Sequence, residues 1–248
     1  MSSMKKSLVV LLFVIAVFGG SALACTNASI NGVYGIISTG LNGSLQPASS
    51  VDQITVDGAG HLKGSSAKSI NGSIVTFTFT GTYLISSNCT GSATFTNQTG
   101  QTEHDKIVLN NGNSGAFLIQ TDANHVQSSI AVAQGAAVCT DLGVKHKYSI
   151  EITGAVTGVG QVAAVGQLTL SGTGTLTGTL AVSENGTITS SATVSGTYVI
   201  NSDCTGTIKM TPKGLSTMNF DAVIVNADKE LMLIETDTNT IVAGTLQE

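Results

Sequence analysis

Alternating apolar and polar residues predict β-strands along most of this chain. The stretch VTFTFTGTYLI shows the pattern most clearly. Neighbouring residues of a strand point to opposite faces, so the stretch has one apolar face and one threonine face. The apolar face consists of Val75, Phe77, Phe79, Tyr83 and Ile85, and Val194, Tyr198 and Ile200 repeat it in the second half. We therefore expect a half-buried strand at both places.

The first half contains about eight such runs, which predicts an all-β fold. They lie near residues 32–39, 50–57, 61–69, 73–86, 90–97, 105–110, 115–121 and 125–133. Short turn sequences such as DGAG, NG and TDAN join them, and short links favour antiparallel neighbours. Eight antiparallel strands with short links predict an up-and-down barrel, which leaves no open sheet edge.

A β-sandwich is the alternative fold. The immunoglobulin sandwich carries a buried Trp and a Tyr two residues before its second Cys. This chain has no Trp, and the spacing from Tyr83 to Cys89 is longer than that. We therefore favour the barrel.

The chain carries one unit twice. GTYLISSNCTGSATF, from Gly81, returns as GTYVINSDCTGTIKM, from Gly196. DGAGHLKG likewise matches SGTGTLTG, and FLIQTDAN matches MLIETDTN. Such self-similarity indicates tandem copies of one structural unit. We expect a barrel over residues 25–137 and a second barrel over residues 138–248.

Residues 1–24 have the pattern of a secretory signal peptide. Lys5 and Lys6 precede the apolar run LVVLLFVIAVF, and the small residues of ALA end at Ala24. An uncleaved anchor helix is the alternative, but the apolar run is short for a membrane span. We expect cleavage after Ala24 and a secreted, extracellular or periplasmic protein.

Four cysteines predict two disulfides in an exported protein. Four cysteines allow three pairings, but the spacing from Cys25 to Cys89 nearly equals that from Cys139 to Cys204. Cys25–Cys89 with Cys139–Cys204 is the pairing that keeps the two units equivalent. Zinc ligation is disfavoured because no two cysteines have a ligand-pair spacing. ALAC resembles the lipobox of bacterial lipoproteins, but a lipid anchor on Cys25 would leave Cys89 without a partner.

The order of these motifs supports a resemblance. NGVYGI, DGAGHLKG, GTYLISSNCTGSATF and LIQTD together resemble a group of uncharacterised secreted bacterial proteins. They are more loosely similar to the small calycin-type barrels related to allene oxide cyclase. The resemblance implies an eight-stranded barrel with a lumen, and it transfers no catalytic residue. The second unit departs from it at LGVKHKYSI.

Candidate chemical groups are few. None of the four histidines is duplicated, and Glu103-His104-Asp105 is the most polar triplet. An acid–base or metal role for this triplet is the alternative to a solvated edge or turn, which we favour. Asp122 and Asp237 begin Asp-x-Asn turns that lack the further acidic residues of a calcium loop. We expect no metal, no cofactor and no catalytic residue.

Charge limits the partners. The net charge is −5, and every basic residue is a lysine. A negative chain without arginine is poorly suited to nucleic acid or to an anionic membrane. Aromatic residues are 4% of the chain, too few for the girdles of an outer-membrane barrel. We therefore expect no nucleic acid and no membrane span.

Two functions remain. The favoured interpretation is a non-catalytic secreted or cell-surface protein with a structural or binding role, toward a glycan, a protein or itself. The alternative is a barrel that binds a small apolar ligand, with isomerase- or cyclase-like activity and a lumen lined by Phe77, Phe79, Tyr83 and Tyr198. Free space in the lumen distinguishes the two, because a packed barrel holds no ligand.

Overall fold

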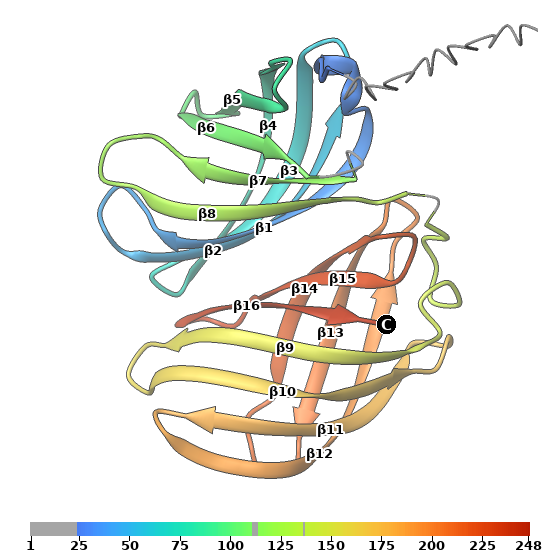
Figure 1. Ribbon diagram of the computed structural model, residues 1–248. Helices are drawn as coiled ribbons and strands as arrows, with labels where there is room; N and C mark the ends of the chain where they lie inside the picture. The colour runs from blue at the N-terminus through green and yellow to red at the C-terminus, as the bar shows by residue number, and fades with distance from the viewer. Residues whose placement is uncertain (1–23, 111–113, 136) are drawn as a thin grey trace, which may run out of the picture.

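The computed structural model describes residues 24–110, 114–135 and 137–248. These residues form two closed antiparallel barrels of eight strands each, one after the other along the chain (Figure 1). Each strand pairs with its neighbours in sequence, and the first strand of each barrel pairs with the last. The predicted all-β fold of two tandem up-and-down barrels is confirmed. Of the predicted signal peptide, residues 1–24, only Ala24 lies within the described residues.

Barrel 1 follows a short 3₁₀ turn, η1 (Asn27–Ser29). Its strands are β1 (Gly32–Leu41), β2 (Pro47–Val56), β3 (His61–Ile70), β4 (Ser73–Ile85), β5 (Thr90–Asn97), β6 (Thr102–Leu109), β7 (Gly115–Gln120) and β8 (Val126–Ala133). Barrel 2 consists of β9 (Lys147–Val156), β10 (Gly160–Leu170), β11 (Thr175–Glu184), β12 (Thr187–Ile200), β13 (Thr205–Pro212), β14 (Met218–Val225), β15 (Glu230–Glu235) and β16 (Thr240–Gln247).

Strand β6 begins earlier than the sequence pattern predicts. It starts at Thr102, so Glu103, His104 and Asp105 lie inside a strand and not at a turn. Alternation along β6 points Glu103 and Asp105 to one face and His104 to the other, as expected for neighbouring residues. That shared face is the inside of the barrel, which corrects the interpretation of the triplet as a solvated edge.

The two barrels differ in how their interiors are filled. Barrel 2 has an apolar core, built from large side chains such as Tyr148, Leu168, Leu176, Ile208 and Phe220, each at most 1% exposed. Barrel 1 has a comparable apolar core only in the half of its lumen near η1. The other half, toward the β1–β2, β3–β4, β5–β6 and β7–β8 turns, is lined by polar side chains.

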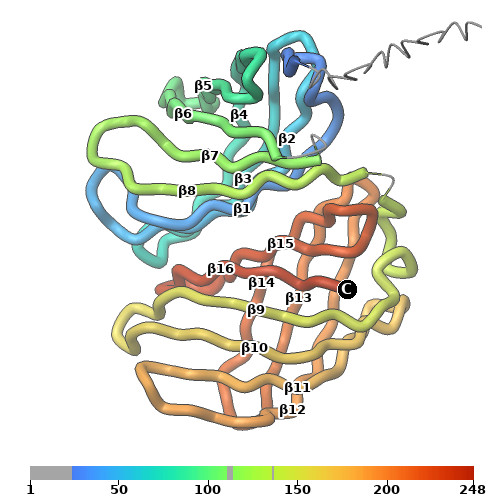
Figure 2. The backbone as a smooth tube through the Cα atoms, viewed as in Figure 1, coloured from blue at the N-terminus to red at the C-terminus, as the bar shows by residue number. Residues whose placement is uncertain are grey.

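The barrels pack directly against each other (Figure 2). The outer faces of β14, β15 and β16 lie against the outer faces of β1 to β3, and an apolar cluster fills the contact, with Val132 of β8 packed against it. Backbone hydrogen bonds flank the contact, among them Asn239 N to Gly72 O at 2.8 Å and Asn226 N to Ala133 O at 2.9 Å. Within the described part of the chain, no helix has the length and hydrophobicity needed to span a membrane.

Candidate functional site: the polar lumen of barrel 1

Barrel 1 holds a cavity of about 70 Å³ at the polar end of its lumen. Strand alternation brings one or two inward-facing residues from each of the eight strands to its wall. Four of these residues carry ionisable side chains: Asp52 on β2, Lys68 on β3, and Glu103 and Asp105 on β6. Charged groups concentrated inside a barrel are unusual, because burying a charge costs free energy unless it is paired.

The second barrel shows that the fold does not require these polar groups. Tyr34, Gly81 and Cys89 match Tyr148, Gly196 and Cys204, which sets the correspondence between the two lumens. The polar positions Ser38, Asp52, Lys68, Asp105 and Gln127 correspond to Ile152, Gly166, Val182, Phe220 and Val242. Gln120 is an exception, because it corresponds to the buried Glu235. The same ring of strands is therefore stable with a largely apolar filling. We conclude that the polar lumen of barrel 1 is a specific feature of the first unit.

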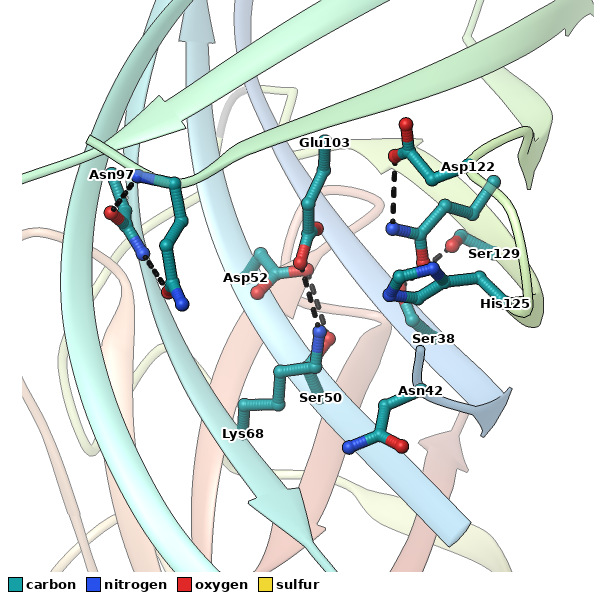
Figure 3. A network of polar contacts seen from close by, with 12 residues as sticks. Ser38, Asn42, Ser50, Asp52, Lys68, Asn97, Glu103, Asp122, His125 and Ser129 are labelled. Atoms are coloured by element: carbon teal, nitrogen blue, oxygen red, sulfur yellow. Dashed lines mark hydrogen bonds and ion pairs between the residues drawn. The ribbon is translucent and has the colours of Figure 1, made fainter. Parts of the chain in front are cut away.

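One ion pair spans the polar lumen (Figure 3). Lys68 Nζ lies 3.3 Å from Glu103 Oε1, and the Lys68 side chain is 9% exposed. Asp52 lies beside this pair, and Ser50 Oγ donates a hydrogen bond to Asp52 Oδ2 at 3.2 Å. The wall of the cavity thus carries three carboxyl groups and one ammonium group. Fully ionised, it has an excess of negative charge.

Two carboxyl groups of this wall have raised pKa values. Burial, together with the carboxylates of Glu103, Asp52 and Asp122, raises the pKa of Asp105 to about 7, although Lys68 lowers it. Burial also raises the pKa of Asp52 to about 6, although Ser66, Lys68 and Ser50 favour its charged form. Near neutral pH Asp105 is therefore close to the midpoint of ionisation, whereas Asp52 is mostly ionised. A cation placed between them would favour the ionised form of both.

Two buried glutamines on the wall leave hydrogen-bonding groups unused. Gln120 and Gln127 are 8% and 6% exposed, and both line the cavity. Gln120 Nε2 donates to Asp122 Oδ2 at 3.3 Å, but its Oε1 has no partner, and neither does Gln127 Nε2. A buried polar atom without a partner costs free energy, so such atoms next to a cavity favour a polar ligand.

Phenylalanines form the boundary between the polar and apolar halves of the lumen. Phe77, Phe79 and Phe95 line the polar cavity, and the rings of Phe79 and Phe95 meet edge to face at 5.5 Å. Below them lies a second cavity of about 50 Å³ with an apolar lining that includes Ile36, Phe95 and Tyr83. Ile36 and Phe95 border both cavities, so the lumen is amphipathic along its axis.

The four residues predicted to line a ligand thus have three different positions. Phe77 and Phe79 border the polar cavity, and Tyr83 borders the apolar one. Tyr198 is 2% exposed in the packed core of barrel 2, and Gly172 N donates to its hydroxyl oxygen at 2.7 Å. The structure therefore does not bring the four together in one site.

Disulfides close the opposite, apolar end of each barrel. Cys25 is bonded to Cys89, and Cys139 to Cys204, which is the predicted pairing. Tyr83 lies beneath the first disulfide end, with its hydroxyl 3.3 Å from the carbonyl oxygens of Asn27 and Ile30. This end also holds the contact of His61 Nδ1 with Asp57 Oδ2 at 2.8 Å in barrel 1 and that of His146 Nδ1 with Glu248 Oε1 at 3.1 Å in barrel 2. We regard the disulfide itself as structural, because both units carry it at the same place.

His104 and Asp122 form a contact that the second unit repeats with other residues, which indicates a structural role. Asp122 accepts hydrogen bonds from His104 N at 2.8 Å and lies 2.7 Å from His104 Nδ1. Asp237 makes the same two contacts with Asn219 N and Asn219 Nδ2. The shared contact ties the β7–β8 turn to β6 in barrel 1 and the β15–β16 turn to β14 in barrel 2. Among the described residues, no group of three or more His, Cys, Asp or Glu side chains could hold a metal ion.

The sequence does not predict most of the polar lumen, because its residues come one or two at a time from eight different strands. The available signal is the comparison of the two repeats, where inward positions change from apolar to charged. Asp52 against Gly166 and Asp105 against Phe220 are the clearest cases.

No protein-family model matches this chain, and no curated protein matches it significantly. Among solved structures, isotype 1 transferrin binding protein B from serogroup B Neisseria meningitidis is similar over 89% of this chain and 75% of that chain. The identity is 9% and the TM-score 0.36. A likeness at this level carries no inference about function. The motif resemblance to secreted bacterial proteins and calycin-type barrels therefore stays a prediction.

Proposed function

We propose that barrel 1 is a binding module for a small organic cation, an amine or ammonium compound with a short apolar tail. The observation that carries the proposal is the polar lumen of barrel 1 at positions where barrel 2 is packed with apolar side chains. Function depends on sites and not on folds, and this is the site that distinguishes two otherwise equivalent barrels.

The chemistry of the lumen favours a cation over other ligands. Burial raises the pKa values of Asp52 and Asp105, and at Asp105 the neighbouring carboxylates raise it as well, so the wall favours an added positive charge. An ammonium group supplies that charge, and Gln120 Oε1 supplies a further acceptor for its N–H groups. The faces of Phe77, Phe79 and Phe95 add a cation–π contribution. An anion would instead face an excess of carboxyl groups.

The size of the lumen limits the ligand. An apolar cavity of about 150 Å³ holds one benzene molecule. The polar cavity of about 70 Å³ therefore has room for an ammonium head with about two or three carbons. The apolar cavity of about 50 Å³ below it can accept the end of a short alkyl tail. At a ceiling of about 1.5 kcal/mol per non-hydrogen atom, a five-atom amine binds no tighter than about micromolar.

Titration with a series of small probes tests the proposal. We expect n-propylamine and n-butylamine to bind the folded chain at pH 8, detected by calorimetry or by NMR shifts of residues in β2, β3 and β6. n-Butanol and butyrate match the alkyl chain without the positive charge, and we expect each to bind at least tenfold more weakly. Equal binding of the alcohol and the amine would contradict the electrostatic part of the proposal.

Two variants locate the binding and exclude a non-specific effect. Asp105→Asn keeps the size of the side chain and removes its charge, and we expect it to weaken amine binding about tenfold or more, as for one charge-assisted contact. Asp221→Asn, on the outer face of β14 in barrel 2, is the matched control and should bind like the wild type. Equal losses in both variants would place the amine outside the lumen of barrel 1.

We also propose that the protein is exported and works outside the cytoplasm. Disulfides persist in oxidising compartments, and the described chain contains two. A structural or binding role without catalysis fits the lumen best, because the groups on its wall bind charge and none forms a nucleophile–base pair. Mass spectrometry of the mature protein tests the predicted cleavage after Ala24 and would detect a lipid on Cys25.

A further inference from the structure

The contact between the two barrels uses one face of each, and the two faces are different. Barrel 2 contributes Val223, Met232 and Ile234 from β14 and β15, which are at most 3% exposed. Barrel 1 contributes Val51 and Ala67 from β2 and β3. We call these the β14–β15 face and the β1–β3 face. Contacts between unlike faces are heterologous, so each partner keeps its other face free.

The equivalent of the β14–β15 face exists on barrel 1 and is uncovered. Val108, Phe117 and Ile119 match Val223, Met232 and Ile234 in sequence. The register is also the same, because Val108 pairs with Phe117 as Val223 pairs with Met232. Val108, Phe117 and Ile119 are 51%, 58% and 56% exposed. We call this the β6–β7 face.

The equivalent of the β1–β3 face exists on barrel 2 and is uncovered as well. Val165 and Ala181 match Val51 and Ala67, and Val165 is 57% exposed. We call this the β9–β11 face. In each barrel the centres of the two faces lie about four strands apart around the ring of eight, although Val132 of β8 packs against the internal contact and Glu151 of β9 lines a groove beside it. A second molecule can therefore reach each free face without displacing the internal contact.

We propose that the chain associates head to tail, with the β6–β7 face of one molecule docked on the β9–β11 face of the next. The occupant is a second copy because the internal contact already shows that these two kinds of face fit. The free faces also carry opposite charges. Lys106 on the β6–β7 face stands where barrel 2 has Asp221, and Glu151 on the β9–β11 face stands where barrel 1 has Ile37.

The association is weaker than the internal contact. Gly35 lets barrel 2 approach closely, since a Cβ there would lie 2.5 Å from Val225 Cγ1. The matching residue on the β9–β11 face is Ser149, whose side chain keeps the partner further away. We therefore expect reversible, concentration-dependent assembly into open chains or rings. The mouth of the polar lumen lies at the strand ends, so this assembly is independent of the proposed amine binding.

Light scattering coupled to size-exclusion chromatography, at protein concentrations up to about 1 mM, tests the proposal. The wild type should increase in mean mass with concentration. Phe117→Lys and Val165→Lys each remove one face and should be monomeric. Leu84→Lys and Ile188→Lys change residues that are equally exposed on other strands, at 62% and 63%, and should associate like the wild type. Melting temperatures within a few degrees of the wild type would show that all four variants are folded.

Mixing the two face variants gives the sharpest outcome. Phe117→Lys keeps an intact β9–β11 face, and Val165→Lys keeps an intact β6–β7 face. An equimolar mixture should therefore form dimers that cannot extend further, although neither variant associates alone. A monomeric wild type, a mixture that remains monomeric, association that survives in either face variant, or loss of association in the controls would each overturn the proposal.

Discussion

Asp105 occupies the position that Phe220 occupies in the second barrel. Burial and the carboxylates of Glu103, Asp52 and Asp122 raise its pKa to about 7, so folding favours its protonated form. A group of this kind contributes most stability below its unfolded pKa and loses that contribution as the pH rises through its folded pKa. For Asp105 this contribution to stability is lost between about pH 4, near its unfolded pKa, and about pH 7, near its folded pKa.

We therefore predict that the free energy of unfolding of barrel 1 falls between pH 4 and pH 8, and that Asp105→Asn reduces this fall. The variant should match the wild type near pH 4 and be the more stable protein at pH 8. Denaturant unfolding at the two pH values measures both quantities. We expect Glu235→Gln to reduce the fall in the stability of barrel 2 in the same way, because burial and Asp237 raise the pKa of Glu235 to about 7. An Asp105→Asn variant less stable than the wild type at pH 8 would contradict the prediction.

At the scale of elements, the repeated GTY and CTG motif ties the long strand of each barrel to the start of its unit. Asn27 Oδ1 accepts a hydrogen bond from Ile85 N at 2.7 Å, and Asp141 Oδ1 accepts one from Ile200 N at 2.8 Å. The adjacent Cys89 and Cys204 have positive φ angles of 64° and 66°. Identical local geometry in both copies indicates a structural role.

We predict that Cys89→Ala destabilises barrel 1 and leaves amine binding by the folded protein intact. A disulfide that closes a loop of this length contributes up to about 4 kcal/mol, and each kcal/mol shifts the melting temperature of a domain of about 100 residues by about 4 °C. Calorimetry should show the transition of barrel 1 about 10 °C lower, with that of barrel 2 unchanged. Cys204→Ala should show the reverse. Lost binding at an unchanged melting temperature would identify the motif as a site.

Sequence periodicity predicts the elements well because a barrel strand alternates strictly between core and solvent. The predicted runs 61–69, 73–86 and 90–97 lie within a residue of β3, β4 and β5. Periodicity places the start of β6 too late. Glu103 and Asp105 are polar residues that point inward, and a run of polar residues is typical of a turn. The disulfides are predictable from equal spacing. The polar lumen is not, because its geometry exists only after the ring closes.

At the scale of the whole molecule, the two barrels share one framework and differ in filling. Barrel 2 is packed with apolar side chains and buries Glu235 among them, whereas barrel 1 combines an apolar half with a half whose lumen is charged. The apolar core of barrel 2 stabilises that barrel without help from its neighbour, so its outer face is a well-ordered surface for barrel 1 to pack on. A partly polar barrel is expected to be less stable on its own, because its buried charges carry a desolvation cost. The contact between β14–β15 and β1–β3 therefore supports the binding unit.

The unlike fillings also bear on how the chain reaches its fold. Tandem copies of one unit can exchange strands during folding, since β8 closes its ring on β1 in the register in which β16 closes its ring on β9. A hybrid ring of β9–β12 with β5–β8 would cross the disulfides and place Glu103 and Asp105 among apolar side chains without Lys68 as partner, and its energy would be high. We therefore predict that Asp52→Gly, Lys68→Val and Asp105→Phe together, which copy barrel 2, yield more crossed disulfides on refolding than the wild type does, as measured by peptide mapping. An unchanged fraction of crossed pairs would show that the lumen takes no part in pairing. If the prediction holds, the charges that select a ligand in the finished protein first select the correct strands during its folding.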